Sequence, residues 1–488
     1  MVLREALSNI SDYICDKWML EDEVRDIVIS SKNVKKGDLY ISLKEDIKNQ
    51  KRARMALDKG AVGIVTGKPI GLANEIVVKD VRKAYALISK AMSGNACDDL
   101  KLIAVTGTNG KTTTTKIISD ILRLSGKKVG VIGTLGVGEG DELVDTGFTT
   151  PDPEILHKTF RKMKERGCEY VVMEASAHAL ALDKLEGLNF DISIFTNLTQ
   201  DHLDFFGDME NYYRAKQKLF SSKLSKMGIV FGDDKYGQRL LNNPQIPLYS
   251  YGISEKFDGS ISDMESSFSG SRLKCKLLGE DFELESKLCG EYNMQNLLAA
   301  CLTSRFLGVT DEQMKNAVKK IEPAEGRFNK IDYNGATVII DFAHTPDGLE
   351  KVLKTAREMT KSRLLCVFGC GGNRDRLKRP MMGKITEELC DEVYITSDNP
   401  RFEKPMDIIE EIEEGMKKDN HKKFTKREEA IAHALRNCHE GDCLVIAGKG
   451  GEKYQDINGI KEPYDDFEVV YKNIAKLQTG KGERVYGK

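Results

Sequence analysis

The sequence predicts an α/β protein of three domains, and three observations support this fold class. The chain has 488 residues, too long for one hydrophobic core and suited to about three domains. Apolar runs of strand length alternate with helical segments, and most of these runs lead directly into polar loops. Two loop-like stretches, SGNACDD (93–99) and EPAEGRF (322–328), contain the glycine, proline and acidic residues typical of breaks. We therefore expect domains at 1–98, 99–328 and 329–488.

The composition excludes several classes of protein. Lysine and arginine total 74 against 76 acidic residues, so no broad nucleic-acid-binding or membrane-binding surface is expected. The N-terminus lacks the apolar core of a signal peptide, and no run of about 18 apolar residues occurs. Most of the 11 cysteines lie in apolar runs, without Cys-x-x-Cys or histidine at ligand spacing. We expect a cytoplasmic protein with buried reduced thiols, in which any metal is held by oxygen.

The middle segment begins with a phosphate-binding pattern. A strand at 102–105, the loop in AVTGTNGKTTTT, a helix at 112–125 and a strand in KKVGVIGT form a parallel β-loop-α-β unit. The loop is a shortened form of G-x-x-x-x-G-K-[ST]. Gly107 and Gly110 let the backbone approach phosphate, Lys111 supplies charge, and the Thr112 hydroxyl suits Mg²⁺. A glycine turn that merely starts a helix is the alternative, but the complete order of elements favours phosphate binding.

Two further predicted strands, in EYVVMEAS and FDISIFTN, add candidate metal ligands. Glu174 ends the first of them, where a second Mg²⁺ ligand belongs, although an exposed strand-end glutamate is the simpler interpretation. His202 follows the second strand among carboxylates, and a metal or phosphate role is as well supported as a structural one. Lys216 has the pattern of a solvated helix lysine, and its position alone gives it no special role.

The last segment repeats the α/β rhythm with strands in TVIIDFAHTPD, RLLCVFGCGGNRD, EVYITSDNPR and DCLVIAGKGGE. Ligands of open α/β sheets bind beyond the carboxyl ends of the strands. Arg374, Arg401, Lys449 and Glu452 follow such ends, and each could be an ordinary surface charge. Together, two arginines and a glutamate suit a zwitterionic ligand, with carboxylates on the arginines and an ammonium on the glutamate. The polar stretch after Tyr471 is expected to be frayed.

These motifs, with GEYNMQNLLAA, EGRF and QDHLDFFGDMENYYRAK, occur in the order seen in the Mur ligases. The chain resembles this family from about residue 25 to about residue 470. The resemblance implies an N-terminal uridine-binding α/β domain, a central P-loop ATPase-like parallel-sheet domain and a C-terminal Rossmann-like α/β domain. It also implies that ATP phosphorylates the D-Glu carboxylate of UDP-MurNAc-L-Ala-D-Glu, and that the amine of a third amino acid then displaces phosphate. The implied setting is cytoplasmic peptidoglycan precursor synthesis.

The same resemblance assigns the ATP and metal sites. Lys111, Glu174, His202 and Lys216 are the implied catalytic residues, and Mg²⁺ is the implied cofactor, held by Thr112, Glu174, His202 and Lys216. Lys216 matches the family's carbamylated lysine (N6-carboxylysine), and a carbamate is an oxygen ligand that Mg²⁺ accepts. The implied ATP-binding residues are Gly107, Thr108, Asn109, Gly110, Lys111, Thr112, Thr113, Asn293, Asn296, Arg327, Asp341 and His344.

The implied partners are small molecules, and we expect a monomer. The implied contacts of the UDP-linked dipeptide are Ser31, Thr149, Thr150, Ser176 and Lys184. Those of the incoming amino acid are Arg374, Asp398, Asn399, Pro400, Arg401, Gly448 and Glu452. An arginine in DNPR predicts meso-diaminopimelate, because lysine has no distal carboxylate to pair with it. meso-Lanthionine satisfies the same two-ended pocket.

The chain departs from the family pattern at several positions. SSK replaces DSR in the uridine-binding stretch, Ala177 replaces a serine, Lys184 stands for an arginine, and Gly451 replaces a histidine. These departures concern the UDP-dipeptide contacts and the choice of amino acid. Three alternatives remain: a folylpolyglutamate-synthetase-like ligase, a nucleotide-gated binding or motor protein, and a relative without activity. The first needs neither the DNPR loop nor a uridine-binding first domain, and the balanced charge and the three convergent loops of the last segment argue against the second. Intact Lys111, Glu174, His202 and Lys216 argue against the third.

Overall fold

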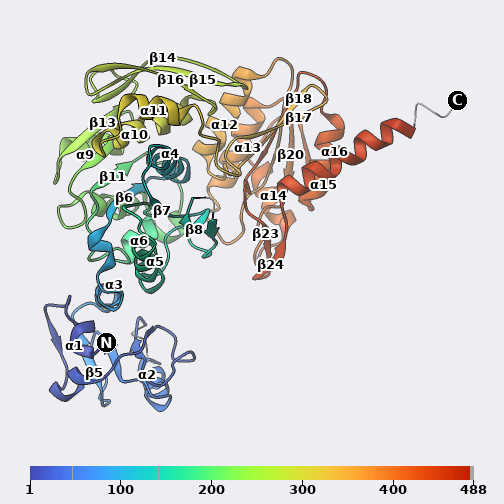
Figure 1. The fold of residues 1–488 in the computed structure, drawn as a ribbon. Coiled ribbons are helices and arrows are strands. Elements are labelled where there is room, and N and C mark those ends of the chain that lie inside the picture. The colour runs from blue at the N-terminus through green and yellow to red at the C-terminus, as the bar shows by residue number, and fades with distance from the viewer. Residues whose placement is uncertain (45, 47, 141, 484–488) are drawn as a thin grey trace.

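The computed structural model describes residues 1–44, 46, 48–140 and 142–483, and within them the strands form three large sheets and a small ribbon. Figure 1 shows the N-terminal elements (blue) and the C-terminal elements (orange and red) adjoining the central ones. This arrangement confirms the predicted α/β class. No helix among the described residues combines the length and the hydropathy needed to span a bilayer.

The first sheet has strands in the order β1-β5-β4-β3-β2, parallel except for the β1–β5 pair. Alternate residues of its strands enter two cores, so Leu39 and Ile41 face α3 whereas Tyr40 and Ile64 face α2. Asp80 caps α3 through the amides of Arg82 and Lys83. The elements are α1 (Leu3–Ala6), β1 (Tyr13–Ile14), η1 (Lys17–Glu21), β2 (Ile27–Val28), β3 (Leu39–Ile41), α2 (Asn49–Asp58), β4 (Gly63–Thr66), β5 (Glu75–Val78), α3 (Val81–Met92) and η2 (Ala96–Asp99).

The central sheet is parallel through β7-β10-β6-β11-β12-β13 and also continues parallel into β14. Ile103 and Val105 of β6 pack under α4 and α10, whereas Leu102 and Ala104 face α5 and α8. Burial on both faces explains the unbroken apolar run in this strand. Its strands are β6 (Lys101–Thr106), β7 (Val129–Gly133), β10 (Tyr170–Glu174), β11 (Ile192–Phe195), β12 (Gly228–Phe231) and β13 (Leu248–Gly252).

Antiparallel strands extend both edges of this sheet, and the sequence analysis did not predict them. They are β8 (Gly136–Glu139) and β9 (Glu142–Val144) on one side, and the meander β14 (Gly259–Ser267), β15 (Gly270–Leu277) and β16 (Glu280–Ser286) on the other. The central helices are α4 (Lys111–Leu124), α5 (Pro153–Glu165), α6 (Ala177–Ala181), α7 (Leu203–Phe206), α8 (Met209–Gln217), η3 (Lys218–Phe220), α9 (Lys235–Asn242), α10 (Glu291–Phe306) and α11 (Asp311–Val318).

The third sheet runs β17-β18-β22-β19-β20-β21 and is parallel except for the β17–β18 pair. The carboxyl ends of β18, β22, β19 and β20 therefore meet at one edge. Its elements are β17 (Asn329–Tyr333), β18 (Ala336–Asp341), α12 (Pro346–Met359), β19 (Leu364–Phe368), α13 (Lys378–Leu389), β20 (Glu392–Thr396), α14 (Pro405–Glu413), β21 (His421–Phe424), α15 (Arg427–Asn437), β22 (Cys443–Ala447), β23 (Tyr454–Ile457), β24 (Ile460–Pro463) and α16 (Asp466–Glu483).

The expectation of a frayed tail is wrong for the described residues. α16 continues through Glu483, and Ile474 and Leu477, which follow Tyr471, pack against the core cluster that includes Ile431 and Leu435. The sequence analysis did not predict these few inward contacts because the stretch is mostly polar. Residues 484–488 of the predicted tail lie outside the described residues. The cysteine prediction is confirmed: all 11 are free, and all but Cys15 are buried.

Candidate functional site

The glycine loop joins the end of β6 to the start of α4, and its backbone excludes larger residues. Gly107 and Gly110 have φ angles of +151° and +85°. A Cβ at Gly107 would lie 1.9 Å from Thr196 Oγ1, and one at Gly110 would lie 2.5 Å from Asn296 Oδ1. The loop leads into the first turn of α4, whose unpaired amides form the positive end of the helix dipole. This is the geometry of an anion site.

Two lysines converge on one carbonyl of this loop. Lys111 Nζ donates to Gly107 O at 3.0 Å and to Thr108 O at 2.8 Å. Lys216 Nζ, on α8, donates to the same Gly107 oxygen at 2.8 Å, and its side chain is buried. Burial, and then the charge of Lys111, hold the pKa of Lys216 well below its ordinary value. Burial also lowers the pKa of Lys111.

Oxygen ligands gather beside these lysines. Thr112 Oγ1 donates to Glu174 Oε1 at 3.0 Å, and Glu174 is only 1% exposed at the end of β10. The backbone amide of Thr134 donates to the same carboxylate oxygen at 2.8 Å. A hydroxyl and a carboxylate at the mouth of a phosphate loop fit Mg²⁺, which takes few protein ligands and completes its shell with water and phosphate. No cluster of three or more His, Cys, Asp or Glu side chains suited to a metal occurs in the part of the chain that the structure describes.

His202 lies in a polar cluster that spans the central and last sheets. Its Nε2 is 3.3 Å from Asp201 Oδ2, and His344 Nε2, which comes from the loop after β18, is 3.8 Å from the same oxygen. Lys378 Nζ approaches Asp201 Oδ1 at 3.6 Å. Burial lowers the pKa of His202 to about 3, so its ring is neutral at pH 7. Burial alone would raise the pKa of Asp201, but the nearby charge of Lys378, the largest opposing influence, holds it below its ordinary value.

The remaining candidate ATP residues divide into those that touch the loop and those that support it. Arg327 Nη2 donates to Thr112 Oγ1 at 3.2 Å, and its guanidinium lies over the Phe342 ring at 4.3 Å. Asn296 accepts a hydrogen bond from Thr114 at 3.2 Å. Asn293 instead donates to the carbonyl of Cys289 in its own helix turn.

Asp341 supports this junction from the end of β18. Its carboxylate accepts from the amides of Phe328 and Ala343, both at 2.7 Å. Burial raises its pKa to about 6. It thus fixes the backbone beside Arg327 rather than facing the glycine loop.

Loops of the last sheet contact the glycine loop directly. Asn109 Nδ2 donates to Asp347 Oδ2 at 2.8 Å, and Thr345 Oγ1 donates to Asn109 Oδ1 at 3.2 Å. The amide of Asn109 is itself held by Asn197 Oδ1 at 3.0 Å. The two predicted sites, at the strand ends of two different sheets, therefore face each other.

The predicted amino-acid pocket is centred on a triangle of side chains: Asn399 and Lys449 are buried, and Glu452 is partly exposed. Asn399 Nδ2 donates to Glu452 Oε2 at 2.9 Å, and Lys449 Nζ donates to Asn399 Oδ1 and Glu452 Oε2, both at 3.0 Å. Glu452 Oε1 makes no hydrogen bond to any described residue. The expected ammonium acceptor is thus already paired through one oxygen and has the other available.

The two predicted arginines lie at the rim of this pocket. Arg401, at φ +52°, donates through Nη1 to Gly372 O at 2.8 Å and lies 3.7 Å from Asp456 through Nε. Burial, then repulsion from Arg374, lowers its pKa. Pro400 precedes it, Asp398 is buried, and a Cβ at Gly448 would lie 2.6 Å from Asp398 Oδ2.

The residues predicted for the UDP-dipeptide are less concentrated. Thr150 Oγ1 donates to Glu174 O at 2.8 Å and accepts from the Ser176 amide at 3.0 Å, and Thr149 lies 3.0 Å from Thr134 between hydroxyls. Ser176 Oγ caps α6. Lys184 pairs with Asp152 at 2.7 Å. Ser31 is buried in the N-terminal unit, and its side chain forms no hydrogen bond to the described residues of the central sheet.

Sequence reasoning missed two buried lysines, Lys378 and Lys449, that organise the site. Lys449 was noted only as a charge in AGKGGE, and Lys378 lies in RLKRP, which has the pattern of a solvated basic run. No signal in the chain distinguished either from a surface lysine. Their burial depends on contacts with distant loops.

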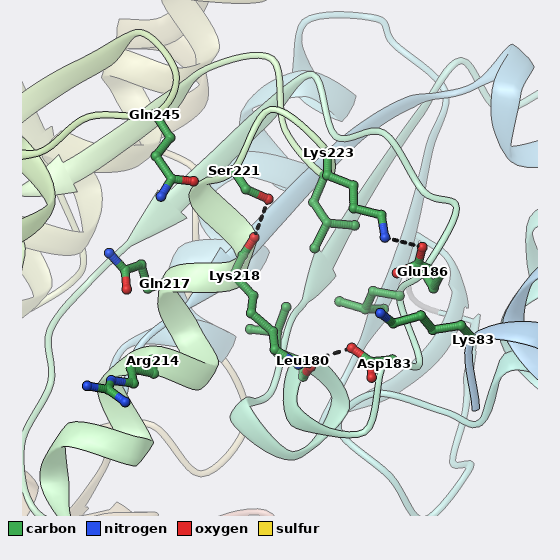
Figure 2. Close-up of a pocket in the computed structure, with 12 residues that line it drawn as sticks. Lys83, Leu180, Asp183, Glu186, Arg214, Gln217, Lys218, Ser221, Lys223 and Gln245 are labelled. Carbon is green, nitrogen blue, oxygen red and sulfur yellow. Dashed lines mark hydrogen bonds and ion pairs between the residues drawn. The ribbon is translucent and has the colours of Figure 1, made fainter. Parts of the chain in front are cut away.

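A separate cavity of about 380 Å³ is lined by Arg214 and Gln217 of α8 and by residues that follow α6 and α8, and Figure 2 shows it. Leu180, Leu185 and Leu224 form its apolar part. Lys218 and Lys223 reach across it to Asp183 and Glu186, in ion pairs of 3.0 and 2.5 Å. None of the predicted site residues lines it.

Comparisons with known proteins match this arrangement. A family model described as Mur ligase middle domain matches residues 105–304, and one described as Mur ligase, glutamate ligase domain matches residues 326–450. The UDP-N-acetylmuramoyl-L-alanyl-D-glutamate--2,6-diaminopimelate ligase of Clostridium tetani is 39% identical, with 98% of this chain and 100% of that protein covered.

Two solved structures extend the comparison. A ligase of the same name has a TM-score of 0.71 at 32% identity, covering 98% of this chain and 99% of the other. The folylpolyglutamate synthase of Mycobacterium tuberculosis, complexed with ADP, has a TM-score of 0.62 at 15% identity, covering 75% and 91%. The second likeness is one of fold alone.

Proposed function

Because the chain belongs to the Mur ligase family, we propose that it joins meso-diaminopimelate to the D-Glu of UDP-MurNAc-L-Ala-D-Glu in an ATP-dependent ligation. The observation that carries the proposal is the meeting of a phosphate loop with loops of a second sheet that bear two arginines and a glutamate. A carboxylate is a poor electrophile, so joining it to an amine needs a leaving group, which ATP supplies. The reaction takes place in the cytoplasm, where ATP is available.

In the first step, a D-Glu carboxylate oxygen attacks the γ-phosphorus of ATP, and the bond to ADP breaks. The amides at the start of α4 and the Lys111 ammonium are proposed to bind the phosphate oxygens, and Arg327, which donates to Thr112, to offset the developing charge. Mg²⁺, when bound, neutralises charge on the transferred phosphoryl group. Thr112, Glu174, His202 and the modified Lys216 are the residues proposed to hold it.

Lys216 is proposed to carry a carbamate. Its amine forms a C–N bond with CO₂ and releases one proton, so a buried cation becomes an anionic oxygen ligand. Burial between Gly107 and Tyr212 favours the neutral amine that this reaction needs. The change also removes the repulsion between Lys216 and Lys111.

In the second step, the amine of diaminopimelate attacks the acyl carbon, and phosphate leaves from the tetrahedral intermediate. Arg374 and Arg401 are proposed to bind a carboxylate of the amino acid, and Glu452 Oε1 its ammonium group. meso-Lanthionine carries the same groups and stays the closest alternative substrate. UDP-dipeptide binding is assigned to Ser31, Thr149, Thr150, Ser176 and Lys184, and domain boundaries are proposed near residues 98 and 328.

The test is phosphate release with ATP, Mg²⁺ and the UDP-dipeptide, comparing meso-diaminopimelate, meso-lanthionine and L-lysine in parallel. Turnover with a two-carboxylate amino acid and not with lysine is the expected result. Preference for lysine would overturn the arginine pocket while keeping the ligase reaction. Release with folate and glutamate, and none with the UDP-dipeptide, would favour the folate-type ligase.

A further inference from the structure

We propose that Lys378 is a positioning residue that aligns the amine site of the last unit with the acyl-phosphate site of the central unit, by docking on Asp201. This inference rests on the proposed ligase function. The residue acts through the loop to which it belongs, by an ion pair with the central unit.

The ion pair lies at the junction between two sheets. Lys378 is the first residue of α13, and Asp201 lies in the loop after β11. The residues are 4% and 6% exposed, and Nζ is 3.6 Å from Oδ1. Removing one partner of a buried pair leaves an uncompensated charge, so the pair holds the two loops in register.

The other oxygen of Asp201 connects this pair to the catalytic groups. Oδ2 lies 3.3 Å from His202 and 3.8 Å from His344. One carboxylate therefore faces Lys378 on one side and two candidate ATP-site histidines on the other. Loss of Lys378 leaves Asp201 beside both rings, so it frees the loop of the last unit without removing this contact at the ATP site.

The loop that ends at Lys378 also carries the amine site. Arg374 and Asp375 lie just before it in the chain, and Asp375 accepts from Gln200 Nε2 at 3.1 Å. The β19–α13 loop thus carries Arg374, which is proposed to bind the amino acid. The same loop contacts the central unit through Asp375, which binds Gln200, and Lys378, which pairs with Asp201. Among the described residues, the neighbouring Arg379 bonds only Glu403, Glu411 and Gly371 of its own unit, so within this loop the contacts with the central unit come from Asp375 and Lys378.

Measuring the two half-reactions separately distinguishes a positioning role of Lys378 from a general structural role. Rapid-quench formation of ADP without amino acid reports phosphorylation, and amide formation in a single turnover with meso-diaminopimelate reports the amine step. Lys378→Met is expected to keep ADP formation within about threefold and to slow amide formation by about tenfold or more. Lys378→Arg should restore part of the second rate. Lys384→Met, at an exposed position of the same helix, should change neither.

Asp201→Asn provides an independent route if Lys378→Met does not fold. The double variant Asp201→Asn, Lys378→Met should lose no more amide formation than the more impaired single variant, because the two residues act as one unit. Equal slowing of both half-reactions, or additive losses, would overturn the positioning role. Absence of amide formation in the unaltered protein would instead refute the proposed function itself.

Discussion

At the scale of single residues, burial lowers the pKa of Lys111 and of Lys216. Both ammonium groups donate to the Gly107 carbonyl, so two positive charges share one acceptor in a desolvated place. The arrangement is costly while both are protonated, and burial together with Lys111 depresses the pKa of Lys216. Conversion of Lys216 to a carbamate would pair opposite charges at the same position.

Lys216→Ala should therefore lose activity through loss of an oxygen ligand rather than loss of a cation. We expect phosphate release to fall by about 10²-fold or more, and to recover in part when bicarbonate and a short-chain carboxylic acid are added together. Lys218→Ala, on the outer face of the same region, is the matched control. Full activity of Lys216→Ala without additives would contradict the carbamate.

Arg401 is the residue that most directly tests the amino-acid pocket. Arg401→Ala should lower kcat/KM for meso-diaminopimelate, because a desolvated charge-assisted pair is lost. The expected loss of transition-state binding free energy is about 2–5 kcal/mol. The KM for ATP should not change. Arg161→Ala, an exposed arginine of α5, controls for loss of charge alone. Equal kcat/KM in Arg401→Ala and the unaltered protein would remove Arg401 from the pocket.

At the scale of elements, the glycine loop permits a closely matched pair of variants. Gly110 and Gly126 have the same φ of +85°, but a Cβ at Gly110 meets Asn296 whereas one at Gly126 meets open space. Gly126→Ala should lower the free energy of unfolding by about 1–2 kcal/mol, the backbone strain alone, and leave ATP affinity intact. Gly110→Ala should show this loss and weaken ATP binding, measured by calorimetry. Unchanged ATP affinity in Gly110→Ala would argue against the loop as the phosphate site.

The DNPR loop is tied to α13 by an ion pair whose effect depends on pH. Glu403 bonds Arg379 at 2.9 and 3.0 Å, and this hydrogen bonding lowers the pKa of Glu403 from 4.5 to about 2. A depressed pKa in the folded state means that the unfolded state binds the proton more tightly. The stabilisation is therefore complete above pH 4.5 and is lost as pH falls toward 2.

Urea unfolding of Glu403→Gln at several pH values tests this pair. The variant should be less stable than the unaltered protein at pH 7, and the difference should shrink below pH 4.5. Glu410→Gln, an exposed position of α14, is the control. A difference that stays constant down to pH 3 would show that the pair does not act through ionisation of Glu403.

For the whole molecule, the sequence was informative wherever a site depends on local order. Strand, glycine loop and helix are consecutive, so Gly107, Lys111 and Thr112 could be assigned from spacing. Strand ends in a parallel sheet share an edge, which placed Glu174 near them. The family resemblance supplied roles, such as that of Lys216, which the pattern alone left as a solvated lysine.

What the sequence could not provide are contacts between units that are distant in the chain. Lys378 meets Asp201 across 177 positions, and no periodicity encodes that meeting. The meander β14–β16 alternates buried and exposed residues, and its strands lack the unbroken apolar runs on which the strand predictions rested. The hydroxyls of Thr150 and Ser176 were predicted for ligand contact, but both are used within the central unit: the buried Thr150 donates to the Glu174 carbonyl, and Ser176 caps α6.

Transfer of ¹⁸O from substrate to phosphate tests the central claim most directly. The UDP-dipeptide is labelled in both oxygens of the D-Glu carboxylate that receives the phosphoryl group, and mass spectrometry follows the released phosphate in the presence of meso-diaminopimelate. An acyl phosphate requires one labelled oxygen in each phosphate and one retained in the new amide. Phosphate without label would show that water takes the phosphoryl group, and would contradict ligation through an activated carboxylate.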